Sequence, residues 1–180
     1  MTRYVVLLRG INVGGRKRVA MSDLRELLGS LGYSDVATYL QSGNAVFTSP
    51  RDDPAGLARE IERRLARDLG MEVPVVIRTR EELAKVVEGN PFPEAASDPI
   101  RLHVSFLSGE PDRKRLAGVD PRTYEPERFE LGDRVIYLWY PNGLGKAKLN
   151  DAFWRRLDLG VHATDRNWNT VTKLLSLAGG

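Results

Sequence analysis

Residues 4–18 read Tyr-Val-Val-Leu-Leu-Arg-Gly-Ile-Asn-Val-Gly-Gly-Arg-Lys-Arg and join an apolar run to a basic, glycine-rich loop. The run Tyr4–Leu8 is typical of a buried strand, and apolar residues at helical spacing follow from Met21 to Leu31. The glycines allow the backbone to expose N–H groups, and four cations stand beside them without one acidic residue. The stretch predicts a β-loop-α unit whose loop binds an anion. The loop residues in this predicted site are Arg9, Gly10, Asn12, Gly14, Gly15, Arg16, Lys17 and Arg18.

Two short β-type runs and a second helix follow this unit. Val36–Gln41 and Ala45–Thr48 are divided by Ser-Gly-Asn, which favours an antiparallel hairpin. Asp53 before a proline predicts the start of a helix that ends at Gly70. Val73–Arg78 then predicts a strand near a sheet edge, because its proline cannot donate a ladder hydrogen bond. The resulting order is β-α-β-β-α-β.

The second half of the chain repeats this order. Thr79 and Glu82 predict a capping box for a short helix, and a proline-rich linker follows at residues 89–100. The later elements expected are strand Leu102–Leu107, helix Pro111–Ala117, a hairpin of Tyr124–Leu131 with Val135–Tyr140, helix Leu149–Leu159 and a final helix from Arg166 to Ala178.

The pattern predicts an α+β protein of two ferredoxin-like (βαββαβ) subdomains in tandem, with a C-terminal helix. The subdomains are expected at residues 1–88 and 101–180. Whether the second subdomain forms its fourth strand stays open, and Val161–Thr164 is the candidate for it. In this arrangement both helices cover one sheet face, and the other face is free to bind or to pack.

The amino-acid composition of the chain excludes several classes of function. The chain has 180 residues, 42% of them hydrophobic, and no cysteine, which excludes disulfides and thiolate chemistry. No apolar run approaches the roughly 20 residues of a membrane helix. We expect a cytoplasmic protein with no membrane partner, no cofactor and no metal site. The net charge of +3 is small, so a functional hypothesis depends on where the cations lie.

Four motifs resemble one protein family over nearly the whole chain. They are Leu-Leu-Arg-Gly-Ile-Asn-Val-Gly-Gly at Leu7–Gly15, Thr-Tyr-Leu-Gln-Ser-Gly-Asn at Thr38–Asn44, Asn-Pro-Phe at Asn90–Phe92 and Arg-Asn-Trp-Asn-Thr at Arg166–Thr170. In this order they resemble the domain of unknown function 1697 family, which is found mainly in bacteria. The resemblance implies two ferredoxin-like subdomains and no established activity. It also implies a threonine at position 165, where this chain has Asp165.

The basic loop is not a Walker-type phosphate loop. Gly10 and Gly15 have P-loop spacing, but Arg16 and Lys17 stand where that motif needs Lys followed by Ser or Thr. The looser hypothesis is an anion held by backbone amides and the loop cations. The alternative is a tight crossover whose cations are solvated.

Two further segments supply polar candidates. Around the hairpin end, Tyr39, Gln41, Ser42 and Asn44 could stack on and hydrogen-bond a base, although ordinary turn chemistry explains the same residues. Arg166, Asn167 and Asn169 could bind a ligand or form a structural latch between the subdomains, which we favour. Lys148 is the cationic companion expected from the second half, with a solvated surface as the alternative.

Catalytic patterns are sparse. His103 and Ser105 share a strand face, but no candidate orienting acid is near them in sequence. The leading hypothesis is a protein that binds an anionic ligand, nucleic acid or a nucleotide, through the basic loop. One alternative is an enzyme acting on a small phosphorylated or carboxylated metabolite between the subdomains. Another is a structural or interaction module. Whether the protein is an enzyme, and its oligomeric state, stay open.

Overall fold

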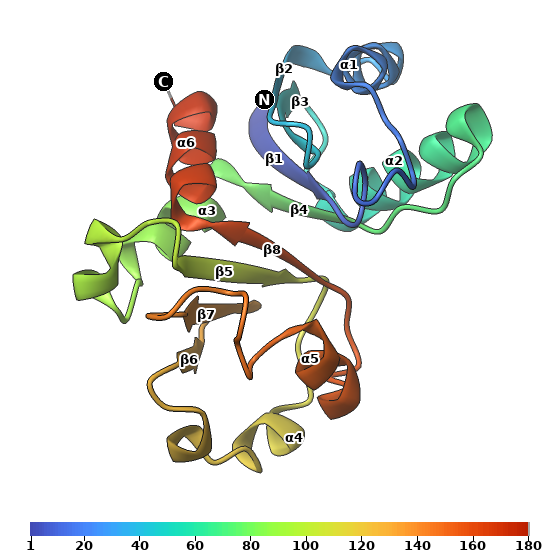
Figure 1. Cartoon of the computed structure of the whole chain (residues 1–180). Coiled ribbons are helices and arrows are strands. Elements are labelled where there is room, and N and C mark those ends of the chain that lie inside the picture. Colours follow the sequence, from blue (N-terminus) through green and yellow to red (C-terminus); the bar gives the residue numbers. More distant parts are fainter. Residues whose placement is uncertain (180) are drawn as a thin grey trace. The chain divides into compact units, whose positions relative to one another are not determined.

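The computed structural model describes residues 1–179 and divides into two compact units (Figure 1). The first unit contains Met1–Lys85 and the residues from Thr172 on, and the second contains Val86–Val171. Within the described residues, no helix is both long and apolar enough to cross a membrane.

The first unit is built on a four-stranded antiparallel sheet. Its strand order is β2-β3-β1-β4, so β4 is an edge strand, as the sequence predicted. The elements are β1 (Thr2–Leu8), α1 (Met21–Ser30), β2 (Ser34–Tyr39), β3 (Asn44–Ser49), α2 (Pro54–Leu69), β4 (Val75–Thr79) and α3 (Arg80–Glu88).

Local sequence explains where these helices begin and end. The Asp53 carboxylate accepts a hydrogen bond from the N–H of Gly56 at 2.9 Å, which caps α2, and Gly70 ends the helix in the left-handed conformation. The predicted capping box also forms, since Thr79 and Glu82 exchange bonds between side chain and backbone N–H.

Both faces of β1 are buried. Tyr4, Val6 and Leu8 form a core with residues of α1 and α2, which cover one face of the sheet (Figure 1). Val5 and Leu7 point to the opposite face and are also buried. The central strand therefore offers no open platform for a ligand.

The second unit repeats the same topology. Its sheet is antiparallel with the order β6-β7-β5-β8, which corresponds strand for strand to the first sheet. The matching order is consistent with tandem ferredoxin-like subdomains. The elements are the 3-10 helix η1 (Pro93–Ser97), β5 (Leu102–Leu107), α4 (Arg113–Ala117), the 3-10 helix η2 (Pro121–Tyr124), β6 (Arg128–Leu131), β7 (Val135–Trp139), α5 (Asp151–Leu157) and β8 (Ala163–Asn167). The last helix, α6 (Trp168–Gly179), begins in this unit, and its residues from Thr172 on belong to the first unit.

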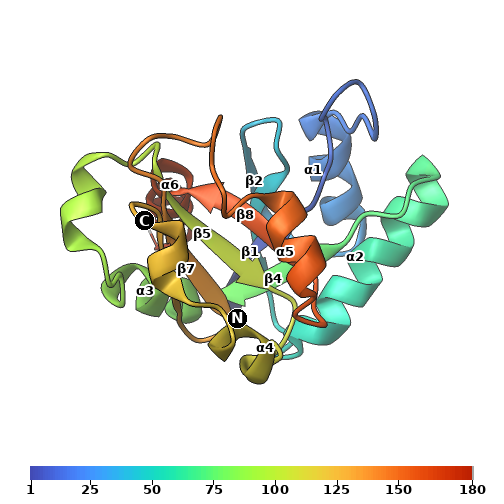
Figure 2. The same ribbon diagram turned by 60° about the horizontal axis from the view of Figure 1, so that its bottom comes forward.

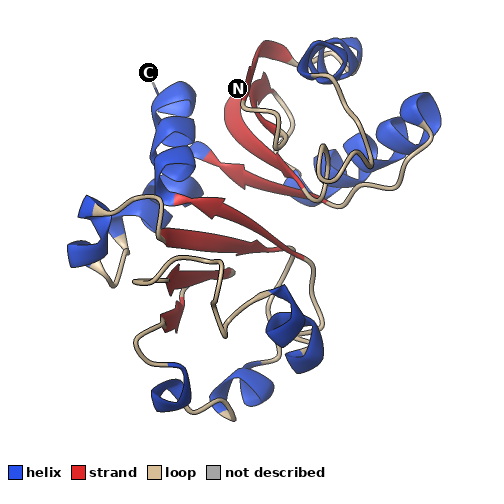
Figure 3. Ribbon diagram, viewed as in Figure 1, coloured by secondary structure: helices blue, strands red, loops and turns tan. Residues whose placement is uncertain are grey.

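A core between the sheet and its helices organises this unit. Leu107 of β5 and Leu138 of β7 pack with Leu116 of α4 and Phe153 of α5. The ribbons of these strands and helices can be followed in Figures 2 and 3. The fourth strand, which the sequence left open, is present as β8. It includes Arg166 and Asn167, so the prediction that the final helix begins at Arg166 is wrong: these residues are extended because they pair with Val104 and His103 of β5.

Candidate functional site: a basic hairpin

The loop between β1 and α1 is a small β-hairpin. Val13 and Arg16 form an antiparallel bridge, and the N–H of Arg16 donates to the carbonyl of Val13 at 3.1 Å. Gly14 and Gly15 form the turn with φ values of +59° and +73°. Two successive positive φ angles define a type I′ turn, which glycine adopts without strain.

The hairpin uses some of the backbone amides that the sequence had offered to an anion. The N–H of Asn12 donates to the carbonyl of Lys17 at 3.1 Å, and the N–H of Arg16 is also used inside the hairpin. These two N–H groups are therefore not available to an anion.

The side chain of Asn12 fastens the hairpin at its base. Its Oδ1 accepts from the N–H of Val19, and its Nδ2 donates to the carbonyl of Val19, both at 2.9 Å. The Nδ2 also donates to the carbonyl of Gln41 at 2.6 Å. Asn12 thus joins the hairpin to the β2–β3 turn, and both N–H donors of its side-chain amide are used.

The β2–β3 turn packs tightly against the start of the hairpin. The N–H of Leu8 donates to the carbonyl of Gly43 at 2.8 Å, and Gly43 has a φ of +89°. A Cβ at Gly43 would lie 2.7 Å from Cδ1 of Ile11 and 2.9 Å from Cβ of Leu8. Only glycine fits this approach.

The predicted polar residues of this turn mostly serve the turn itself. Asn44 is buried, and its Nδ2 donates to the Tyr39 carbonyl at 2.8 Å and to the Ser42 hydroxyl at 3.0 Å. Tyr39 is half-buried, whereas Gln41 is exposed beside Asn12. The loop and the turn therefore contact each other through Asn12 and Gln41.

The four cations of the hairpin divide into two kinds. Lys17 is fixed, because its Nζ donates to the carbonyl of Glu72 at 2.5 Å. Within residues 1–179, the exposed side chains of Arg9, Arg16 and Arg18 make no hydrogen bond or ion pair. By contrast, Arg51 on the same unit bonds Glu60 at 2.7 Å.

Two apolar side chains are exposed in the same two segments. Val13 is 66% exposed beside the hairpin turn, and Leu40 is 52% exposed in the β2–β3 turn. We call the exposed set the basic hairpin site; its members are Arg9, Val13, Arg16, Arg18 and Leu40. It pairs unneutralised positive charge with apolar surface.

The remaining predicted residues belong to the second unit. Arg166 is buried, and loss of solvation lowers its pKa to about 10. Its Nη1 donates to the Thr164 hydroxyl at 2.9 Å. The Oδ1 of Asn167 accepts from the N–H of Thr170 at 3.0 Å and so caps α6. Asn169 is exposed in the first turn of α6, and Lys148 is exposed in the loop before α5.

The structure also forms a polar cluster that the sequence did not predict. Ser105 of β5 lies opposite Asp165 of β8, and their side chains share a hydrogen bond. His103 is on the same strand face, and its ring meets that of Tyr140 edge-on with centroids 5.4 Å apart. Asp165 is the acid that was missing near His103 and Ser105, and it comes from 60 positions later in the chain.

This cluster does not have the geometry of a Ser-His-Asp triad. The Ser105 hydroxyl bonds the carboxylate, and Nε2 of His103 donates to the carbonyl of Ile100 at 3.0 Å. Loss of solvation lowers the pKa of His103 and raises that of Asp165, although Asp165 keeps exposed surface. Among the described residues, no group of three or more His, Asp or Glu could hold a metal ion.

Comparison with known proteins gives a family and a fold. The sequence profile of the family described as "Protein of unknown function (DUF1697)" matches residues 1–137. The conserved bacterial protein SP0830 from Streptococcus pneumoniae has a similar solved structure, with a TM-score of 0.78 and 26% sequence identity over 98% of each chain. None of the curated proteins matches the sequence.

Proposed function

The chain belongs to the DUF1697 family of proteins of unknown function, and we propose that it binds nucleic acid through its basic hairpin site. The contacts would be made to phosphate groups by Arg9, Arg16 and Arg18. A cytoplasmic location, expected from the absence of cysteine, is part of this proposal.

The observation that carries the proposal is a set of three arginines, on a fixed hairpin, that form no hydrogen bond or ion pair with the part of the chain that the structure describes. Asn12 and Lys17 hold the hairpin to its surroundings through bonds to Gln41 and Glu72. Guanidinium groups bind phosphate oxygens through several N–H donors, and fixing their backbone lowers the entropy lost on binding.

The character of the site favours nucleic acid over a small anion. Its cations are spread from Arg9 to Arg18, which suits a ligand with repeated phosphates. Val13 and Leu40 add exposed aliphatic surface, and side chains of this kind contact bases in many nucleic-acid complexes. Phosphate contacts alone predict affinity with little sequence preference.

Fluorescence anisotropy with a labelled 20-nucleotide single strand and the matching duplex tests the proposal across a salt series. Binding should weaken as salt rises, because bound phosphates release counterions. The double variant Arg16→Ala, Arg18→Ala should reduce the slope of log K against log salt by about 0.7–0.9 per lost contact. The matched control is Arg59→Ala with Arg63→Ala, two exposed arginines of α2 on the same unit.

Three results would overturn the proposal: no binding at low salt, binding that ignores salt, or equal losses in the two double variants. A thermal-shift screen addresses the alternative ligand class. If a phosphorylated metabolite stabilised the wild type but not the Arg16, Arg18 variant, and no oligonucleotide bound, the site would be one for small anions.

A further inference from the structure

Strand β6 is an edge strand of the second sheet. It pairs with β7 along Arg128–Leu131, and the sheet order β6-β7-β5-β8 places no strand from residues 1–179 on its other side. An edge of this kind presents backbone N–H and C=O groups that another extended segment can bond.

The register identifies which groups face outward. The N–H of Gly132 donates to the carbonyl of Val135 at 2.8 Å, which makes this a hydrogen-bonded pair. Because such pairs alternate along an antiparallel ladder, Phe129 and Leu131 direct their backbone groups away from β7. No described residue bonds those groups on the outer side.

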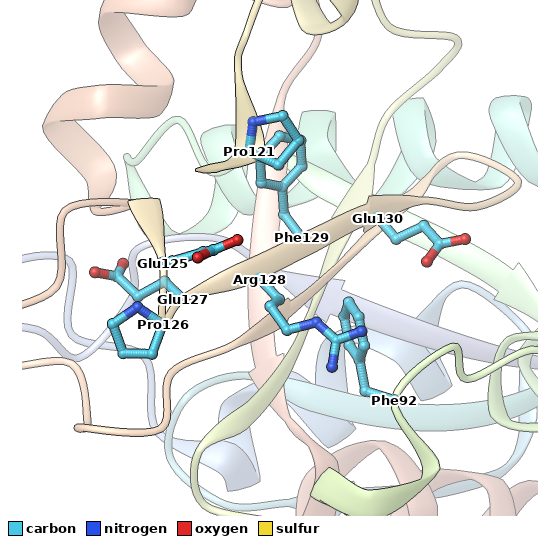
Figure 4. A pocket seen from close by; sticks show the side chains of 8 residues that line it. All are labelled: Phe92, Pro121, Glu125, Pro126, Glu127, Arg128, Phe129 and Glu130. Atoms are coloured by element: carbon cyan, nitrogen blue, oxygen red, sulfur yellow. The ribbon is translucent and has the colours of Figure 1, made fainter. Parts of the chain in front are cut away.

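A recess of about 570 Å³ runs beside this edge (Figure 4). Six consecutive residues, Glu125 to Glu130, line it, together with Phe92 and Pro121. The volume lies within the range of ligand-binding pockets. The recess therefore follows the backbone of the edge strand and its approach.

The two sides of the edge differ in chemistry. Phe129 and Pro121 supply apolar surface on one side. On the other side the Arg128 guanidinium lies 4.6 Å from the centre of the Phe92 ring and bonds Glu94 at 2.8 Å. Alternation along β6 places Glu130 on the same side as Arg128.

The charged side chains along this edge that form no ion pair with the described residues are negative. Both carboxylate oxygens of Glu127 accept backbone N–H groups, from Lys148 and Leu149 at 2.9 Å. The charge of Arg128 is paired with Glu94. Glu125 and Glu130 are exposed and form no ion pair with the described part of the chain.

The edge strand β2 of the first sheet is protected from pairing with a further strand, whereas β6 is not. β2 has a register irregularity between Ser34 and Ala37, and Arg3 donates to the carbonyl of Asp35 at 2.7 Å. Irregularities and covering side chains are ways in which proteins block edge pairing. The register of β6 with β7 is regular throughout.

We propose that the β6 edge binds an extended peptide segment as an additional strand. The outward groups of Phe129 and Leu131 would bond its backbone. Glu130 on one side of the strand selects basic side chains, and the surface of Phe129 and Pro121 on the other side accepts apolar ones. The preferred segment therefore alternates basic and apolar residues. This inference does not depend on the basic hairpin site.

A fluorescein-labelled peptide of four Lys-Val repeats is the probe, and a Glu-Val peptide of equal length is the control. Anisotropy should show binding of the Lys-Val peptide and at least about tenfold weaker binding of the Glu-Val peptide. Two N-methylated forms of the Lys-Val peptide then test strand addition. One carries methyl groups on the odd residues and the other on the even residues.

One N-methylated form should lose binding by about tenfold or more, because half of the N–H groups of an added strand face the protein. The other should bind within about twofold of the parent, since its methyl groups face solvent. Equal losses in both forms, or no binding of the parent peptide, would refute strand addition.

Charge reversal tests the residues themselves. Glu130→Lys should weaken binding of the Lys-Val peptide by about tenfold. Glu81→Lys is the matched control: Glu81 is also exposed, lies in the first unit and forms no ion pair among the described residues. Equal effects of the two substitutions would show that net charge, and not this edge, attracts the peptide.

Discussion

Asp165 on β8 lies directly opposite Ser105 on β5, and the Ser105 hydroxyl donates a hydrogen bond to its carboxylate. That bond favours the ionised carboxylate, whereas loss of solvation, the larger effect, favours the neutral acid. The pKa of Asp165 is therefore raised, and an ionised Asp165 costs the folded protein free energy.

We expect Asp165→Thr, the residue that the family resemblance places here, to stabilise the protein at pH 7. A raised folded pKa contributes stability below the unfolded value of about 3.9 and loses it as the pH rises through the folded value. The gain in Tm at pH 7 should be small, about 1–2 °C, because Asp165 keeps exposed surface through which water screens its charge. Thermal unfolding at pH 4 and pH 7 measures it. A variant less stable than wild type at pH 7 would contradict this account.

For His103 we expect the opposite dependence of stability on pH from that of Asp165. Burial lowers its pKa, so the neutral ring is favoured in the fold. Its contribution to stability is present above the unfolded pKa of about 6.5 and is lost as the pH falls through the folded value. Urea unfolding followed by tryptophan fluorescence should show this loss in wild type and not in His103→Gln. The same replacement of the exposed His162 by Gln serves as the control for removing a histidine.

Gly43→Ala should destabilise the first unit by about 1–3 kcal/mol. The added methyl group would overlap Ile11 and Leu8, and the φ of +89° is unfavourable for alanine. Gly29→Ala in α1 is the control, because a Cβ there meets no atom within 4 Å and alanine favours the helix. Far-UV circular dichroism during urea unfolding compares them. Equal free energies for the two variants would rule out the close packing at Gly43.

Asn12→Gly isolates the side chain that fastens the hairpin. Glycine accepts the φ of +55° at this position, so the substitution removes the bonds to Val19 and Gln41 without backbone strain. We expect a loss of about 1–3 kcal/mol in unfolding free energy. Amide exchange should also quicken in the hairpin. Unchanged exchange at Val19, whose N–H bonds Asn12, would show that the hairpin holds itself.

Glu127→Gln should cost the second unit about 1–3 kcal/mol. The carboxylate accepts two backbone N–H groups, and glutamine has a single acceptor oxygen for them. The neighbouring Glu125→Gln, at an exposed position without such bonds, should be nearly neutral. All three tryptophans, Trp139, Trp154 and Trp168, lie in the second unit, so their fluorescence reports its unfolding. Similar losses for both glutamates would remove the special role of Glu127.

The strands and helices were predictable where the signals are local. Asp53 with its following proline, and Thr79 with Glu82, start helices as expected, because capping depends on residues three positions apart. β8 was harder. Asp165, Arg166 and Asn167 have no strand pattern of their own, and they are extended because β5 pairs with them.

The sequence indicated which segments make up the candidate site, but not the backbone geometry of the site. The basic loop and the β2–β3 turn do meet, through Asn12 and Gln41. The sequence could not show that Gly14 and Gly15 form the turn of a hairpin whose own hydrogen bonds use some of the backbone amides. The segments on either side of the turn are too short to show the alternation of apolar and polar residues that marks a strand. The pairing of Ser105 with Asp165 joins distant positions, and local patterns carry no information about it.

The division of the chain has a consequence for how the protein is made. The first unit needs residues from Thr172 on, including Leu177, whose carbonyl accepts a bond from Arg3. A ribosome synthesises these residues after the whole of Val86–Val171. The first unit therefore begins the chain but lacks its last segment until the second unit has been synthesised, and a nascent chain truncated before residue 172 would leave the first unit incomplete.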